Sequence, residues 1–157
     1  MSDILDRPSA KAALALLRLH QAVYVATDGR VGHRLLGVPC LLLRTTGRRS
    51  GARRTACLLY ARDRDDYLVV ASLGGSNRPP GWLENTRAEP HVDVQVARRR
   101  FPAVATVVER DHPEHTRLWR LVNEHSGGRY DRYQARTPRP IPVVRLAPVA
   151  PFPPGSG

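Results

Sequence analysis

Apolar runs separated by glycine-rich and arginine-rich segments divide the chain into short predicted strands and helices. The run Cys40–Leu43 is continuously apolar, which is typical of a strand buried on both faces. Residues 91–97 instead alternate between polar and apolar side chains, as a half-exposed strand does. The whole pattern predicts about six strands, at residues 40–43, 54–61, 67–72, 91–97, 101–109 and 141–146.

Helical spacing is present in three segments. Residues 9–27 have Ser9 as the predicted N-cap, residues 81–88 follow two prolines that suit a first helical turn, and residues 112–125 have Asp111 as the predicted N-cap. The predicted apolar side of the first helix consists of Leu14, Leu17, Leu19 and Val23. Most strands are joined by hairpins or by one short helix, so the pattern predicts an α+β fold of the small-barrel kind and not alternating βαβ units.

One main domain is expected, because 157 residues at 41% hydrophobic content can bury a single core. Residues 1–38 are assigned to an N-terminal helix and connector, and residues 39–147 to the main domain. Residues 148–157 are rich in Pro and Gly and are expected to be a disordered tail.

The start of the chain, MSDILDRPSA, does not have the form of a secretory signal, and no apolar run approaches the roughly 18 residues needed to span a bilayer. A cytoplasmic protein is therefore expected. Cys40 and Cys57 are the only cysteines, too few for a disulfide framework and too far apart for a zinc knuckle. They are expected to be buried reduced thiols, and no metal site is predicted.

The formal net charge is +11, and Lys11 is the only lysine, so the positive charge comes almost entirely from arginine. Arginine favours forked recognition of phosphate and carboxylate groups. Charge alone leaves three partner classes open: nucleic acid, an anionic membrane surface and an anionic small ligand. The first helix accordingly has two interpretations, packing on the core or peripheral contact with the inner face of the cell membrane, since basic residues flank its apolar side.

A loop after the first long strand carries the strongest chemical signal. In Thr45–Thr55, the sequence TTGRRSGARRT combines glycines, hydroxyl side chains and four arginines. Glycines let backbone amides approach an oxyanion closely, while arginine adds charge and fork geometry. The loop therefore predicts a site for a phosphate or a row of carboxylates. Nucleic acid is not expected, because no aromatic residue lies among these basic residues.

A second loop follows the strand that ends at Ser72. Its Gly-Gly pair exposes backbone groups, and Trp82 and Asn85 on the next helix can cover and hydrogen-bond a planar heterocycle. Farther along the chain, Tyr130 and Tyr133 have helical i, i+3 spacing and could line one wall of a pocket.

These residues carry a resemblance to a known family. The stretch LLLRTTGRRSGARRTACLLY, followed by YLVVASLGG and PPGWLENTRAEPHVDVQV, resembles the deazaflavin-dependent nitroreductases of actinobacteria, over about residues 35–146. The resemblance implies a split β-barrel related to the FMN-binding split barrels, and coenzyme F420, a deazaflavin, as cofactor. The chain departs from the family pattern at Cys57, where Pro is more frequent, at Leu73, where Lys can occur, and at Leu83, where an aromatic residue is frequent.

The resemblance also implies a set of site residues. The first loop would hold the phosphate and oligoglutamate tail of F420, and the second loop and its helix would surround the ring. The implied cofactor-binding residues are Thr46, Gly47, Arg48, Arg49, Ser50, Arg53, Arg54, Thr55, Ala56, Cys57, Leu58, Ala71, Ser72, Leu73, Gly74, Gly81, Trp82, Leu83, Glu84 and Asn85.

The expected activity is hydride transfer from the reduced deazaflavin to an electron-poor small molecule such as a quinone, an enone or a nitroaromatic. Tyr130 or Tyr133 is the expected proton donor or orienting group, with Ser72 as the next choice. Two alternatives stay open, an FMN-binding reductase of the same fold and an F420-binding carrier without turnover. A homodimer paired through sheet surfaces is a further expectation.

Overall fold

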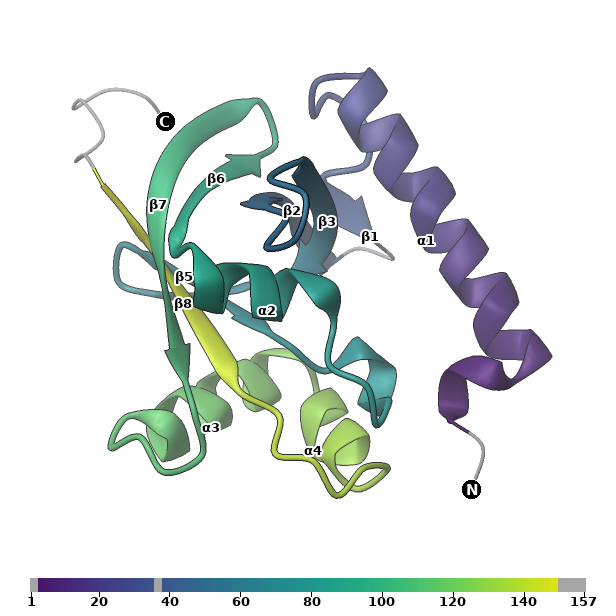
Figure 1. Ribbon diagram of the computed structural model, residues 1–157, viewed down its shortest axis with the longest axis vertical. Coiled ribbons are helices and arrows are strands. Elements are labelled where there is room, and N and C mark those ends of the chain that lie inside the picture. The colour runs from purple at the N-terminus through teal and green to yellow at the C-terminus, as the bar shows by residue number, and fades with distance from the viewer. Residues whose placement is uncertain (1–2, 36–37, 150–157) are drawn as a thin grey trace.

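Figure 1 shows a computed structural model of the protein, which describes residues 3–35 and 38–149. Its helices are α1 (Pro8–Ala26), α2 (Gly81–Ala88), α3 (His115–His125) and α4 (Arg129–Gln134), with short 3-10 turns η1 (Ile4–Asp6) and η2 (Leu73–Gly75). Its strands are β1 (Arg34–Leu35), β2 (Val38–Thr46), β3 (Arg53–Leu59), β4 (Ala61–Asp63), β5 (Asp66–Val70), β6 (His91–Val96), β7 (Arg99–Val108) and β8 (Val143–Pro148).

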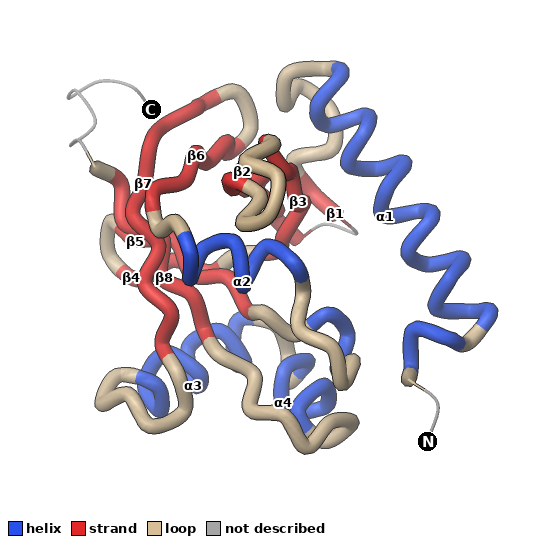
Figure 2. Tube along the Cα trace, in the orientation of Figure 1, coloured by secondary structure: helices blue, strands red, loops and turns tan. Residues whose placement is uncertain are grey.

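The strands form one curled antiparallel sheet, which Figure 2 shows beside the four helices. Its order is β1-β2-β6-β7-β8-β5-β4, and β3 pairs with β2 outside this path. The expectation of an α+β split barrel with flanking helices is confirmed. The predicted strands are present, although β2 and β7 begin earlier than the hydrophobic pattern indicated, and the short strands β1 and β4 were not predicted.

Alternation along the strands builds two cores on opposite faces of the sheet. Leu41 and Leu43 of β2 face the inside of the barrel, where Trp82 and Leu83 of α2 also pack. Leu68 of β5 faces the other way, toward Leu118 of α3. Because helices cover both faces, the central strands are apolar at nearly every position, which explains the continuous apolar runs in the sequence.

Helix α1 covers a third region, on the outer face of β2 and β3, and lies along one side of the barrel in Figure 1. Tyr24 is its one fully buried residue, and its hydroxyl accepts a hydrogen bond from the Ala97 N–H at 2.8 Å. The prediction that the apolar side of this helix packs on the core was wrong, because Leu17, Leu19 and Val23 are 40%, 62% and 36% exposed. The helix instead meets the barrel through polar and aromatic residues on its other side.

Both predicted N-caps were wrong. Arg7 occupies the N-cap position of α1, and its side chain makes no capping hydrogen bond. Pro8 begins the helix, and because proline has no N–H, one backbone donor fewer needs a partner there. Residues 110–114 form turns, so α3 starts after Glu114 and not at Asp111. No helix in the described ranges is long and apolar enough to cross a bilayer. The predicted tail lies outside the described residues from residue 150 onward.

Candidate functional site

An open groove with a volume of about 570 Å³ lies where the β2–β3 loop faces α2, η2 and the middle of α1. The two loops selected from the sequence therefore meet in space. The groove is lined by Arg18, Gly47, Arg48, Arg49, Ser50, Arg54, Thr55, Ala56, Leu73, Pro80, Gly81, Trp82 and Asn85.

The β2–β3 loop is closed by its own backbone. The Gly47 N–H donates to the Ala52 carbonyl at 2.7 Å, and the Gly51 N–H donates to the Gly47 carbonyl at 2.8 Å. A Cβ on Gly47 would lie 3.1 Å from both the Ala52 carbonyl oxygen and Ser50 Oγ, so a larger residue here would press against the turn. The turn presents Arg48, Arg49 and Ser50 to the groove.

Asn85 fixes this loop against α2. Its side chain is only 5% exposed, and Oδ1 accepts from the Arg48 backbone N–H at 3.2 Å and from the Arg48 guanidinium at 3.0 Å. Its Nδ2 donates to Thr45 Oγ1 at 3.2 Å. Both ends of the amide are thus used within the protein, and Asn85 positions the loop more directly than it offers hydrogen bonds to a ligand.

The groove carries unpaired positive charge. Arg18, Arg48, Arg49 and Arg54 line it, and in the part of the chain that the structure describes none of them pairs with a carboxylate. Arg53, next to Arg54 on β3, instead pairs with Asp93 on β6. Guanidinium groups beside hydroxyl side chains are the donor set that phosphate and carboxylate groups prefer.

The η2 side of the groove is held by a half-buried arginine. Arg139 donates to the carbonyls of Ala71 at 3.1 Å, Ser72 at 3.0 Å and Ser76 at 2.9 Å. Its partial burial lowers the pKa of the guanidinium from its usual value, although the group stays charged. These three bonds fix the segment that carries Leu73 to the groove wall. Leu73 has a positive φ of 43°, which marks a tightly constrained turn.

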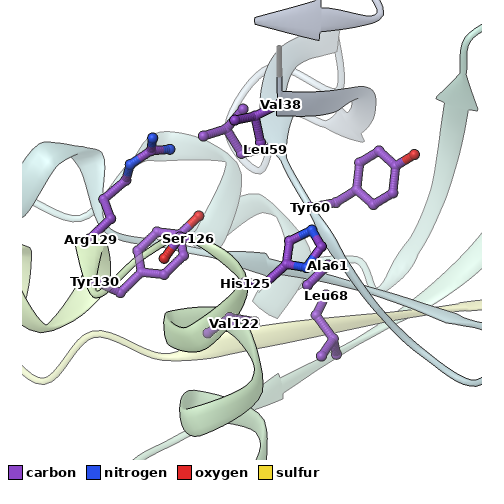
Figure 3. A pocket seen from close by; sticks show the side chains of 10 residues that line it. All are labelled: Val38, Leu59, Tyr60, Ala61, Leu68, Val122, His125, Ser126, Arg129 and Tyr130. Carbon is purple, nitrogen blue, oxygen red and sulfur yellow. The ribbon is translucent and has the colours of Figure 1, made fainter. Parts of the chain in front are cut away.

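The two candidate tyrosines lie next to this segment but not in the groove lining. Tyr130 is 7% exposed and lines a separate cavity of about 10 Å³ beside Leu68 and Val122, as Figure 3 shows. Burial raises the pKa of its phenol to about 12, so the group is neutral at physiological pH. Tyr133 lies closer to η2, because the Arg136 guanidinium sits 5.3 Å from its ring centroid and also donates to the Gly74 carbonyl at 3.3 Å.

The groove lining contains half of the residues selected from the sequence. Those outside the groove lining serve other contacts: Arg53 pairs with Asp93, Glu84 pairs with Arg87, and Leu83 packs in the barrel core. Thr46, Cys57, Leu58, Ala71, Ser72 and Gly74 also lie outside the lining. Sequence reasoning missed Arg18, Pro80 and Arg139, and only the Pro-Pro pair before α2 gave a local signal for one of them.

Comparison with known proteins shows the family to which the chain belongs. Residues 16–148 match the model of the F420H(2)-dependent quinone reductase family. The F420H(2)-dependent quinone reductase Rv1261c of Mycobacterium tuberculosis is 52% identical over 132 residues, which cover 83% of this chain and 89% of that protein. The chain belongs to the F420H(2)-dependent quinone reductase family. It is therefore an oxidoreductase with coenzyme F420 as its cofactor, as the resemblance implied.

Solved structures agree with the family assignment. An F420H2-dependent reductase, FDR-A, superposes with a TM-score of 0.60 at 35% identity, over 69% of this chain and 93% of its own. A protein described as a domain-swapped dimer superposes with a TM-score of 0.62 at 30% identity, over 85% of this chain and 98% of its own. The two superpositions cover 69% and 85% of this chain, so the shared fold extends over most of it.

Proposed function

We propose that this protein binds reduced F420 in the groove and reduces a quinone beside it. The observation that carries the proposal is the groove itself, which is lined by Trp82 and by four arginines that have no carboxylate partner among the described residues. F420 needs both kinds of contact, because it has a planar ring at one end and a phosphate and oligoglutamate tail at the other. The quinone as acceptor is supported by the named activity of the 52% identical relative.

The residues present fit the cofactor. Arg48, Arg49 and Arg54, with the hydroxyls of Ser50 and Thr55, would hold the phosphate and the acidic tail. Trp82 and Leu73 would flank the ring, and Gly81 leaves room there because no atom lies within 4 Å of a Cβ built on it. When bound, the reduced deazaflavin supplies a hydride to the acceptor. The protein's part is to orient the two rings, keep water away and deliver a proton.

We assign the proton-delivering or orienting role to the phenol of Tyr133. Tyr133 lies on α4, and the Arg136 guanidinium over its ring donates to the Gly74 carbonyl of η2, in the segment that carries Leu73 to the groove wall. Tyr130 packs deeper, in the small cavity against β5, and is assigned to packing.

A direct test mixes purified protein with F420H2 and menadione and follows the reappearance of oxidised F420. We expect the rate of menadione reduction to rise in proportion to enzyme concentration. With reduced FMN in place of F420H2, the enzyme should add nothing to the rate measured without it. Tight F420 binding without any menadione reduction would instead favour an F420 carrier.

Substitution of Tyr133 by Phe is expected to lower kcat about tenfold or more while the Kd for F420 changes less than about twofold, because the phenol acts on the acceptor side. Tyr130→Phe is the matched control and should retain most of the turnover, since its ring still fills the cavity. Steady-state kinetics and fluorescence titration measure the two quantities. A large rise in Kd with unchanged kcat would move Tyr133 to the binding residues.

The exposed leucines of α1 support a further proposal, that this helix contacts a membrane surface where lipid-soluble quinones reside. Leu16 and Leu19 are 68% and 62% exposed, and Arg18 lies between them in sequence. Cosedimentation with anionic lipid vesicles tests this contact, and full recovery of the protein in the supernatant would contradict it.

A further inference from the structure

Three side chains with sulfur or nitrogen donors converge beneath α1, outside the F420 groove. The ligand atoms of His20, Cys40 and Cys57 all lie within 4.8 Å of one another, which makes them the candidate metal-binding group within residues 3–35 and 38–149. The Nδ1 atom of His20 is 3.8 Å from the sulfur of Cys57. Neither the groove lining nor the proposed hydride transfer uses any of the three.

Strand register places the two thiols side by side. In the β2–β3 pair, Cys40 lies opposite Leu59 and Leu42 lies opposite Cys57, so the cysteines are diagonal neighbours on one face. That face is the outer one, because Ala56 and Leu58 point to the barrel core. Cys40 and Cys57 are too far apart in sequence for a zinc knuckle, but the β2–β3 hairpin brings them close together in space.

Helix α1 brings the histidine to the same place. Tyr24, one helical turn after His20, is fully buried, and its hydroxyl lies 3.2 Å from the Cys40 carbonyl oxygen. Gln21 also donates to the Thr55 carbonyl at 3.1 Å. These contacts fix the helix over β3 and direct the His20 ring toward Cys57.

The donor atoms have the chemistry and the spacing of a metal site. Two thiols and an imidazole are ligands for thiophilic ions such as Zn²⁺ and Cu⁺. Zinc bond lengths to sulfur and nitrogen place neighbouring ligand atoms about 3.5–3.8 Å apart in a tetrahedral site. The three ligand atoms lie within 4.8 Å of one another, which is about 1 Å more than this spacing. Small side-chain rotations would therefore bring them to the distances of a zinc site. The ring nitrogen that faces the Cys57 sulfur is Nδ1, which makes Nδ1 the ligand atom of His20.

We propose that His20, Cys40 and Cys57 bind one thiophilic metal ion, Zn²⁺ or Cu⁺, that ties α1 to the barrel. Binding would release the thiol protons and leave one coordination position for water in the case of zinc. Since Arg18 precedes His20 by two residues and lines the groove, the ion would also steady the α1 side of the F420 site. The proposal is independent of which acceptor the enzyme reduces.

Metal binding can be measured on the full-length, untagged protein. After reduction and chelator treatment, the protein is titrated separately with Zn²⁺, Co²⁺ and, without oxygen, Cu⁺. We expect one ion per chain to stay bound through gel filtration, and Co²⁺ to give thiolate-to-cobalt charge-transfer absorption. Protection of both thiols from alkylation by the bound ion is a readout that needs no variant.

The variants identify the ligands. Cys57→Ala and His20→Ala should each lower metal affinity at least tenfold. Replacement of His112, an exposed histidine in the turn before α3, by alanine should leave it unchanged. Circular dichroism shows whether each variant folds. Absence of stable binding by the reduced wild-type protein, or alkylation of Cys40 and Cys57 at equal rates with and without metal, would overturn the proposal. Formation of a Cys40–Cys57 disulfide on mild oxidation, without metal retention, would overturn it in favour of a redox-active thiol pair.

Discussion

Replacement of both Arg49 and Arg54 by alanine is expected to weaken F420 binding about tenfold or more, with little change in protein stability. Both side chains line the groove and are exposed, so their loss leaves no cavity and no buried group without a partner. A charge-assisted hydrogen bond contributes about 1.5–3 kcal/mol, and solvent access reduces that figure. Two weakened contacts together correspond to roughly 1.4 kcal/mol or more, which is a tenfold change in Kd.

The neighbouring arginine provides a matched control for this double variant. Arg53 is adjacent to Arg54 on β3 but pairs with Asp93 on β6 and does not line the groove. Arg53→Ala should therefore leave the Kd for F420 within about twofold of the wild-type value, although it removes a positive charge next to Arg54. Fluorescence titration measures the Kd for F420 of the double variant and of Arg53→Ala.

A fragment of the coenzyme separates local contacts from a general loss of charge. The deazaflavin without phosphate and tail should bind the wild-type protein and the Arg49→Ala, Arg54→Ala variant equally, because we propose that these arginines hold the acidic end. Rising salt should weaken F420 binding to the wild-type protein more than to the variant. Equal losses for the fragment and for full F420 would show that the arginines hold the ring end.

Much of the fold could be predicted from local sequence because local rules decide it. The bounds of α2 follow directly from the two prolines before Gly81 and from Pro90 after it. Strand pairing is another matter. β2 pairs with β6, and β5 pairs with β8, and neither pair is adjacent in the chain. Hydrophobic alternation gives each strand two faces but does not specify its neighbours.

The site shows the same division between local and long-range information. The β2–β3 loop could be selected from the sequence because its glycines, hydroxyl side chains and arginines are clustered, and it does line the groove. Arg18 reaches the groove only because α1 crosses β3, and its surroundings in sequence resemble any basic helix surface. Likewise, Cys40 and Cys57 gave no metal signature in sequence, because only their strand register makes them neighbours.

Arg139 is the clearest case of an important residue without a local signal, since it lies in an irregular segment between α4 and β8. Arg139→Lys is expected to lower the free energy of unfolding by about 2–4 kcal/mol. The guanidinium satisfies three carbonyls at once, whereas one ammonium on a flexible stem cannot reach all of them, and each buried acceptor left without a donor costs about 1–3 kcal/mol. Urea unfolding followed by circular dichroism should show a lower midpoint with an unchanged slope.

The same substitution should also lower turnover, because the carbonyls of Ala71 and Ser72 belong to the segment that places Leu73 on the groove wall. Arg132→Lys is the appropriate control, since Arg132 is exposed and donates to a single carbonyl, that of Gly127, at 3.0 Å. Arg132→Lys should change the free energy of unfolding by no more than about 0.5 kcal/mol, the usual range for surface substitutions. If Arg139→Lys and Arg132→Lys had equal midpoints in urea, the three carbonyl contacts would not hold the loop. A loss of stability with full turnover would mean that the groove keeps its shape without them.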